Sequence, residues 1–311
     1  MAWLHHNLPV RVSDGRVLQL CGEGDQLTRD AIAALCLELG IHFTKELALF
    51  GVREDGSHFI IQLSEKPFEL FLSAGSNSPH AFELNYVDLG LCQGGVVGSS
   101  ITEEQGEAEL VFLRIARRDA IKRYLMVPIR LNEQTVIAVA SLILALAVVV
   151  NGVHVSSGVL EAIESYIPKA CLSTRSHKDW NMLVSRAARS LLQQGEKDLS
   201  LQLLRELALT DLTSGFTYSG VYVEHEGSQV NVEVTICVSR LGVSLYKEGE
   251  RVAWYPYGSI CGWTVLMDKL WFHVMLDSVK TKLLLVTSSA DDIVRLIQYY
   301  IARITEGLMI K

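Results

Sequence analysis

The most informative segment of the sequence is an apolar run in the middle of the chain, Val136-Ile-Ala-Val-Ala-Ser-Leu-Ile-Leu-Ala-Leu-Ala-Val-Val-Val150. Ser141 is its only polar residue. A transmembrane helix needs about 20 apolar residues, and Asn151-Gly152 interrupts this run before that length is reached. Lysine and arginine are sparse on both flanks, which also argues against a membrane span. We therefore expect a buried helix at the centre of a helical bundle, with a membrane span as the alternative.

The composition is that of a globular protein. Of 311 residues, 49 % are hydrophobic and 20 % are charged, and a domain of about 100–200 residues is typical, so we expect two or three domains. The net charge of −7 gives no general attraction to nucleic acid, so phosphate binding would need a local basic patch. The six cysteines contain no C-x-x-C pair, and the first residues do not read as a signal peptide, so we expect a cytosolic protein.

Before the apolar run, residues 8–89 mix strands and a helix. Asp14-Gly15 separates two alternating runs, which predicts a β-hairpin. A helix over 28–39 follows, with Thr28 as the expected N-cap. Further strands are expected at 46–50, 58–62 and 81–87. This order of hairpin, helix and three strands is that of ubiquitin-like folds.

The apolar run belongs to a helical segment. A polar, glycine-rich stretch over 90–108 reads as a linker. Helices are then expected over about 107–125, 133–150, 177–194 and 197–209, from the spacing of their apolar residues.

After the helices the pattern returns to alternation. Strands are expected at 229–238, 241–246, 251–255, 259–265, 269–276 and 281–286. A helix capped by Ser288 or Ser289 then closes the segment. About seven strands followed by one amphipathic helix is the pattern of pleckstrin-homology and phosphotyrosine-binding folds. We assign Trp254 and Trp271 to its core.

The order of the three segments resembles that of FERM domains. The resemblance implies an α+β, three-lobed cloverleaf: a ubiquitin-like F1 lobe at 1–89, a linker at 90–108, a helical, acyl-CoA-binding-protein-like F2 lobe at 109–212 and a PH/PTB-like F3 lobe at 213–311. Leu47-Ala-Leu-Phe50, Tyr166-Ile-Pro-Lys169 and Trp254-Tyr-Pro-Tyr257 resemble the FERM region of Janus kinases. The closing helix from Asp291 is similar to those of talin and of MyTH4-FERM myosin tails.

No motif for catalysis is present. The sequence contains no P-loop, no G-x-S-x-G elbow and no H-E-x-x-H zinc motif. We therefore predict no enzyme activity, no catalytic residue, no metal site and no cofactor, although the chain could be the regulatory region of a larger kinase.

Two candidate binding surfaces stand out. The first is a basic helix that would contact anionic lipid head groups or an acidic partner, with a solvated helix face as the alternative. Its residues are Arg114, Arg117, Arg118, Lys122 and Arg123, extended by Arg186 and Arg189. The second surface is a peptide groove that the phosphotyrosine-binding-like pattern implies, with core or edge packing as the alternative. Its residues are Ser259, Ile260, Trp263, Val265, Leu296, Tyr299 and Tyr300.

These features predict a docking module. We expect a cytoplasmic protein, peripheral at the inner face of the plasma membrane, that binds the cytoplasmic tail of a transmembrane receptor and anionic phospholipids, as in Janus kinase-type signalling. A partner domain within a longer protein would be a further ligand, and nucleic acid would not. The alternatives are a cytoskeletal or motor-tail linker that binds cargo or adhesion receptors, and a membrane-inserted protein that uses 136–150 as a span.

Overall fold

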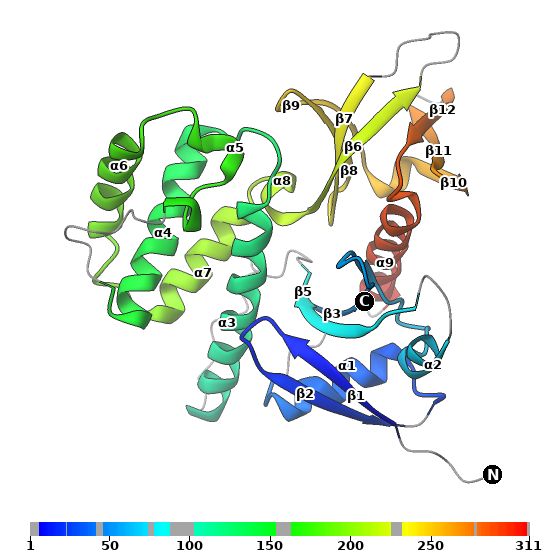
Figure 1. The fold of residues 1–311 in the computed structure, drawn as a ribbon, viewed down its shortest axis with the longest axis horizontal. Helices are drawn as coiled ribbons and strands as arrows, with labels where there is room; N and C mark the ends of the chain where they lie inside the picture. Colours follow the sequence, from blue (N-terminus) through cyan, green and yellow to red (C-terminus); the bar gives the residue numbers. More distant parts are fainter. Residues whose placement is uncertain are drawn as a thin grey trace. The chain divides into compact units, whose positions relative to one another are not determined.

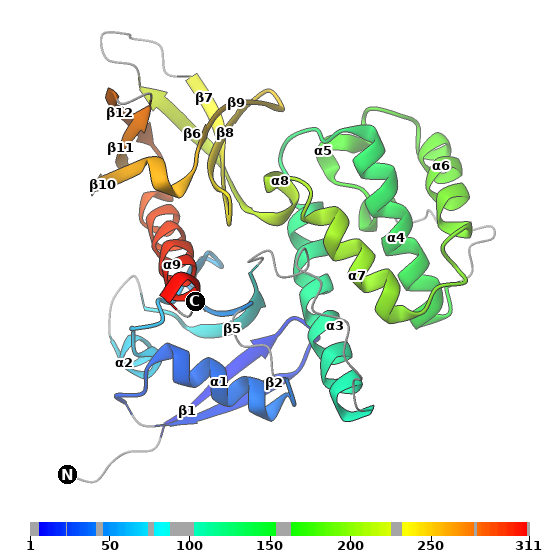
Figure 2. The same cartoon turned by 180° about the vertical axis from the view of Figure 1, so that it is seen from behind.

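The structure is a computed structural model, shown from two sides in Figures 1 and 2. It describes residues 6–22, 24–41, 46–73, 78–87, 103–153, 163–224, 232–276 and 279–309. The chain divides into two compact units. Unit 1 contains residues 1–89, 97–119 and 288–311, and unit 2 contains residues 90–96 and 120–287.

Unit 1 is built on a five-stranded sheet of order β2-β1-β5-β3-β4. β1 runs parallel to β5, and the other pairs are antiparallel. This is the ubiquitin-like arrangement that the order of elements predicted. The strands are β1 (His6–Val12), β2 (Val17–Gly22), β3 (Leu47–Val52), β4 (His58–Ile60) and β5 (Ala81–Tyr86).

Local chemistry explains the start of this sheet. Gly15 has φ of +95°, and the Asp14 carboxylate accepts a hydrogen bond from the Arg16 backbone N–H at 3.0 Å, so the predicted hairpin forms. The expected cap at Thr28 is wrong, because Thr28 is the first residue of α1 (Thr28–Glu38) and Leu27 precedes it without a side-chain cap. The Thr28 hydroxyl instead donates to the backbone carbonyl of Glu65 at 2.9 Å. A short helix, α2 (Pro67–Leu72), was not predicted.

Two helices from later in the chain also belong to unit 1. One is the first part of α3 (Glu103–Leu125), where the buried Asp119 carboxylate accepts the Tyr86 backbone N–H at 2.6 Å. The Tyr86 and Phe112 rings meet edge to face at 6.0 Å. The other is α9 (Ala290–Met309), the last element of the chain. The predicted linker at 90–108 falls mostly outside the described residues, and α3 already begins at Glu103.

In unit 2, the apolar run forms α4 (Glu133–Asn151). The Asn132 side chain caps its start by accepting the Gln134 N–H at 2.8 Å, and Gly152 ends it in the left-handed conformation. α4 packs against α6 and α7, and its inward side chains share a core with Trp180 and Ile167. The unit also contains η2 (Ile163–Ser165), α5 (Lys169–Leu172), α6 (His177–Arg189), α7 (Glu196–Leu207) and α8 (Asp211–Ser214).

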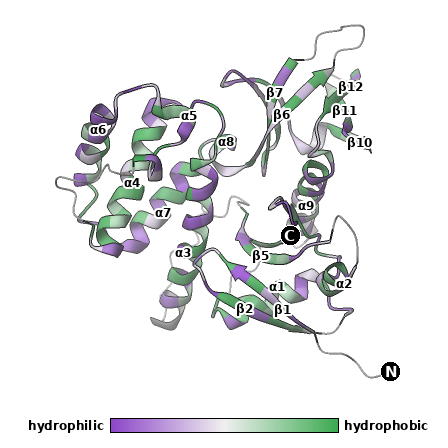
Figure 3. Cartoon of the chain, in the orientation of Figure 1, coloured by the Kyte–Doolittle hydropathy of each residue, from purple (hydrophilic) through white to green (hydrophobic). Residues whose placement is uncertain are grey.

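α4 is long and apolar enough to cross a membrane by length and composition alone, with a mean hydropathy of 2.2. Half of its most apolar stretch is buried inside the protein. Figure 3 colours most of α4 hydrophobic and much of α6 hydrophilic, as expected if α4 is a core helix and α6 faces water on one side. The packing is therefore that of the buried helix expected from the sequence.

The rest of unit 2 is a seven-stranded antiparallel sheet of order β10-β11-β12-β6-β7-β8-β9. The strand β6 was not predicted from the sequence. β10 and β9 lie at the two edges of the sheet. Trp254, which we assigned to the core, is 46 % exposed. The strands are β6 (Phe216–Glu224), β7 (Val232–Ser239), β8 (Gly242–Lys247), β9 (Glu250–Tyr255), β10 (Ile260–Leu266), β11 (Lys269–Leu276) and β12 (Val279–Val286).

Candidate docking surfaces

The basic helix is α3, and its arginines do not all face water. Arg114, Arg118 and Lys122 recur every four residues and are exposed, as expected for one face of a helix. Arg117 is only 7 % exposed, so our placement of it on the same solvent face is wrong. Arg117 lies on a buried side of α3, and Asp119, two residues later, is buried as well.

The other predicted basic residues divide in the same way. The Arg123 guanidinium lies 4.8 Å from the centre of the Phe216 ring, and the side chain is half-buried. Because the Arg123 guanidinium stacks on this ring inside unit 2, only part of its surface is accessible to a lipid head group. Arg186 and Arg189, in the last turn of α6, are exposed.

The predicted peptide-binding strand forms β10, and it is an edge strand. Among the described strands it pairs only with β11, so one row of its backbone groups has no sheet partner. Its register shifts at Ile260 and Gly262. The predicted anchors Ile260, Trp263 and Val265 are half-buried. Ser259 lies before the strand, in η3 (Tyr257–Ser259), where its hydroxyl donates to the Pro256 carbonyl at 2.8 Å.

The three groove residues predicted on α9 are not accessible. Leu296 is 2 % exposed, and Tyr299 and Tyr300 are 0 % exposed. The Tyr299 hydroxyl donates to the Leu47 carbonyl of β3 at 3.3 Å and accepts from Arg303 Nε at 3.1 Å. Burial raises the pKa of this hydroxyl. These side chains are therefore packed inside the protein and do not line an open groove, contrary to our expectation.

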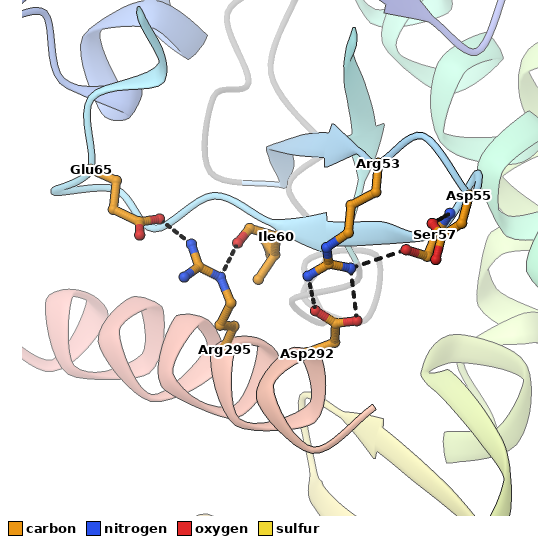
Figure 4. A network of polar contacts seen from close by, with 7 residues as sticks. All are labelled: Arg53, Asp55, Ser57, Ile60, Glu65, Asp292 and Arg295. Atoms are coloured by element: carbon orange, nitrogen blue, oxygen red, sulfur yellow. Dashed lines mark hydrogen bonds and ion pairs between the residues drawn. The ribbon is translucent and has the colours of Figure 1, made fainter. Parts of the chain in front are cut away.

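α9 is instead tied to the ubiquitin-like sheet by a polar network that the sequence did not reveal (Figure 4). Arg53 at the end of β3 donates two hydrogen bonds to the Asp292 carboxylate, at 2.7 and 3.1 Å. Its Nη1 also donates to the Ser57 hydroxyl at 3.1 Å. The hydrogen bond to Asp292 raises the pKa of Arg53.

A second arginine, Arg295, lies on α9 itself, about one turn after Asp292, and binds residues of the ubiquitin-like part. Arg295 donates from Nε to the Ile60 carbonyl at 3.1 Å and forms an ion pair with Glu65. The backbone carbonyl of Arg295 accepts from Gln62 Nε2 at 2.7 Å. The guanidinium groups of Arg53 and Arg295 lie 4.4 and 5.2 Å from the centre of the Phe59 ring. The Phe59 ring and the carboxylates together hold the first turns of α9 on this sheet.

Within the described residues, no group of three or more histidine, cysteine, aspartate or glutamate side chains has the arrangement of a metal site. The described cysteines Cys21, Cys36, Cys171, Cys237 and Cys261 are free thiols.

Solved structures show which known fold this is. The C-terminal MyTH4-FERM domain of human myosin 7b, solved with the harmonin-a PDZ3 domain, superposes with a TM-score of 0.71 over 98 % of this chain at 15 % identity. The complex of the FERM and C-terminal domains of Drosophila Merlin gives a TM-score of 0.66 over 97 % of this chain and 99 % of that chain, at 11 % identity. The chain has the FERM fold. No protein-family model matches its sequence, and no curated protein matches it.

A third FERM-containing structure, the MyTH4-FERM MF2 domain of Dictyostelium discoideum myosin VII, gives a TM-score of 0.65 over 96 % of this chain at 12 % identity. This chain spans 61 % of the human myosin 7b structure and 58 % of the Dictyostelium one. Identities this low show the fold alone. The predicted α+β FERM fold is confirmed, while the resemblance to Janus kinases stays a prediction.

Proposed function

We propose that this FERM fold is a non-catalytic docking module, which binds the cytoplasmic tails of transmembrane receptors at β10 and anionic lipids of the inner leaflet through α3. The observation that carries the proposal is the open edge of β10, which has only β11 as a strand partner in the described structure. An extended peptide can add to such an edge through backbone hydrogen bonds, while side-chain pockets select its sequence.

The side chains of β10 suit this role. Trp263 pairs across the sheet with Phe272, and Phe272 is 2 % exposed, so Trp263 lies on the inner face of the sheet. Being half-buried, it is both held by the core and accessible to a partner. Tryptophan is over-represented among residues that dominate interface energies. The docking surface we propose is therefore Ile260, Trp263 and Val265 with the β10 backbone, without the buried residues of α9.

The lipid contact is proposed for the exposed cations of α3, with Arg186 and Arg189 of α6 as further contacts. Arg114, Arg118 and Lys122 share one helix face, and each basic residue near an anionic membrane contributes about 1 kcal/mol. Such a contact supports recruitment to the plasma membrane in addition to peptide binding.

A cytoskeletal or motor-tail linker is the second candidate. It is favoured by the solved structures that share the fold, because myosin tails and Merlin are among them. In this role the same β10 edge would take a cargo or adhesion-receptor segment instead of a signalling-receptor tail.

The peptide proposal is tested with a panel of synthetic juxtamembrane segments from receptors, cargo segments of motor tails, and filamentous actin. We expect receptor segments to bind, and Trp263→Ala to weaken that binding at least tenfold. Trp271→Ala is the matched control, since Trp271 lies opposite Thr264, on the other face of the sheet from Trp263. Binding to actin or cargo segments alone would select the linker, and equal loss in both variants would contradict docking at β10.

The lipid proposal is tested separately with vesicles that contain phosphatidylserine. Replacing Arg114, Arg118 and Lys122 by glutamate should abolish vesicle binding, with the largest effect at low salt. The charge-matched control replaces Arg29, Lys247 and Lys280, which are exposed and lie outside α3 and α6. If both variants lose binding equally, only net charge matters and the α3 surface is not a lipid site.

A further inference from the structure

Unit 2 contains a pocket of about 360 Å³ that neither proposed surface uses. Four segments form it: the connection that leads into α4, the connection between α7 and α8, the turn between β7 and β8, and the turn between β8 and β9 with the adjoining strand ends. Its volume lies within the range of about 300–1,000 Å³ typical of ligand pockets. No pattern in the sequence indicated it, because its lining residues come from parts of the chain that are separated by many residues.

The floor of the pocket is a buried, fully engaged carboxylate. Asp211 is 6 % exposed, and it accepts hydrogen bonds from the Ser244 hydroxyl and, at 2.5 Å, from the Tyr246 hydroxyl. The backbone N–H of Leu212 donates to it at 3.1 Å. These bonds hold α8 against β8 and give the pocket a rigid base, with the carboxylate directed into the fold.

The rim of the pocket carries two cations. Arg130 and Arg251 both line it and are exposed. Neither forms an ion pair with any residue in the described part of the chain. With Asp211 hydrogen-bonded below, the accessible charge of the pocket is positive, in a chain whose net charge is −7.

Exposed apolar side chains also line the pocket. Leu209 and Leu241 line the pocket and are 66 % and 43 % exposed. The Arg251 guanidinium lies 5.9 Å from the centre of the Trp254 ring, which is itself 46 % exposed. Exposed apolar groups gathered around a concave site indicate a binding surface when polar groups rim them.

We propose that this pocket binds a linear peptide segment that carries a carboxylate next to a large apolar side chain. The carboxylate would bind the guanidinium groups of Arg130 and Arg251, which suit planar anions, and the apolar side chain would cover Leu209 and Leu241. A phosphate group alone would satisfy the arginines and leave both leucines in water. The proposal goes beyond docking at β10, because it concerns a separate surface, to which the opposite edge strand, β9, contributes Arg251.

The test begins with selection of binders from a random library of 12-residue peptides displayed on phage, using the full chain as bait and the Arg130→Ala, Arg251→Ala double variant for counter-selection. We expect the enriched peptides to share an aspartate or glutamate adjacent to leucine, phenylalanine or tryptophan. A synthetic selected peptide without tryptophan should change the fluorescence of Trp254, and Trp254→Phe identifies that signal.

The affinity of this peptide should fall at least tenfold in the double variant, and less in Arg130→Lys, Arg251→Lys, which keeps the charge. Lys247→Ala, an exposed cation on the same hairpin that does not line the pocket, should bind as the unmodified chain does. Thermal unfolding of each variant verifies that it is folded. Trp263→Ala should also leave this binding intact, so failure here and failure of docking at β10 are distinguishable.

The proposal is overturned if the selected peptides lack acidic residues, if no peptide is enriched, or if the double variant binds them equally well. Inorganic phosphate and vesicles containing phosphatidylinositol phosphate are titrated in parallel. If either of these depends on Arg130 and Arg251 while the peptides do not, the pocket is an anion or lipid site and the peptide assignment is wrong.

Discussion

Two polar junctions in this molecule, each built on carboxylates, join distant parts of the chain in different surroundings. In unit 1, Arg53 and Arg295 bind Asp292 and Glu65 between the ubiquitin-like sheet and α9, with 15–27 % of each side chain exposed. In unit 2, Asp211 binds Ser244 and Tyr246 between α8 and β8 and is only 6 % exposed. Each junction fixes the orientation of a helix on a sheet. Water can replace a lost hydrogen-bond partner at the junction of α9, but not at the buried junction of α8.

The difference sets how each junction responds to damage. A solvent-screened ion pair contributes about 0–1 kcal/mol, whereas removing one member of a buried polar set leaves its partners unsatisfied, at about 1–3 kcal/mol for each group. The junction of α9 should therefore be adjustable by salt and by single substitutions. The junction of α8 should behave as a fixed part of the fold beneath the pocket.

The largest effect is expected at the buried junction. Asp211→Ala should lower the free energy of unfolding by about 3 kcal/mol, because the Ser244 and Tyr246 hydroxyls lose their acceptor inside the protein. Urea denaturation measures this. Asp198→Ala, at an exposed position of α7, is the control and should change little.

A triple variant tests whether unsatisfied hydroxyls cause this loss of stability. Combining Asp211→Ala with Ser244→Ala and Tyr246→Phe removes the unsatisfied hydroxyls together with the carboxylate. Stability should then recover part of the loss, because no donor is left without an acceptor. If Ser244→Ala and Tyr246→Phe each lowered stability further when added to Asp211→Ala, as two independent losses, unsatisfied partners would not explain the effect.

A smaller effect is expected at the junction of α9. A double-mutant cycle with Arg53→Ala and Asp292→Ala should give a coupling energy of about 1 kcal/mol that falls markedly in 1 M NaCl. The exposed pair Lys66 and Glu69, with 37 % and 59 % of their side chains exposed, serves as reference and should give a coupling near zero. A coupling that is insensitive to salt would place the Arg53 pair with the buried junction instead.

The smallest effect is expected from chemical labelling of the cysteines. The rate at which each thiol is labelled reports how deeply it is buried, and no substitution is needed. Burial raises the pKa of Cys36 to about 11 from 9.0, and it also raises the pKa of Cys237. At pH 8 both thiols are protonated, so iodoacetamide should label the exposed Cys21 and Cys261 first. Peptide mapping by mass spectrometry measures the order.

The sign of the accompanying pH effect follows from the same shift. Because the folded-state pKa of Cys36 is raised, its protonated form stabilises the fold fully below pH 9, and this contribution is lost as the pH rises towards 11. A Cys36→Ala variant should lose that part of the pH dependence.

In the labelling experiment, early modification of Cys36 or Cys237 at pH 8 would contradict their burial.

The sequence predicted those parts of the molecule that depend on local periodicity. The apolar run became the core helix α4, and Asp14-Gly15 made the expected hairpin. The strand that we expected at 259–265 became β10. Local pattern could not show that α9 packs through Tyr299 on β3, because an amphipathic stripe does not specify which surface covers it.

For the same reason, the site was predicted only in part. Spacing placed Arg117 within a basic cluster, but the face of α3 that it occupies depends on contacts with the rest of unit 1. The pocket beneath Arg130 and Arg251 depends on four segments that meet only in the folded chain. Neither residue belongs to a recognisable motif.

Hydrogen–deuterium exchange of the full chain, with and without a bound receptor-tail peptide, would locate the docking strand. Addition of a strand to the open edge predicts slower exchange of the backbone amides of Ile260–Leu266, with β7 in the interior of the sheet unchanged. Slower exchange elsewhere in the chain, with these amides unaffected, would contradict docking at β10.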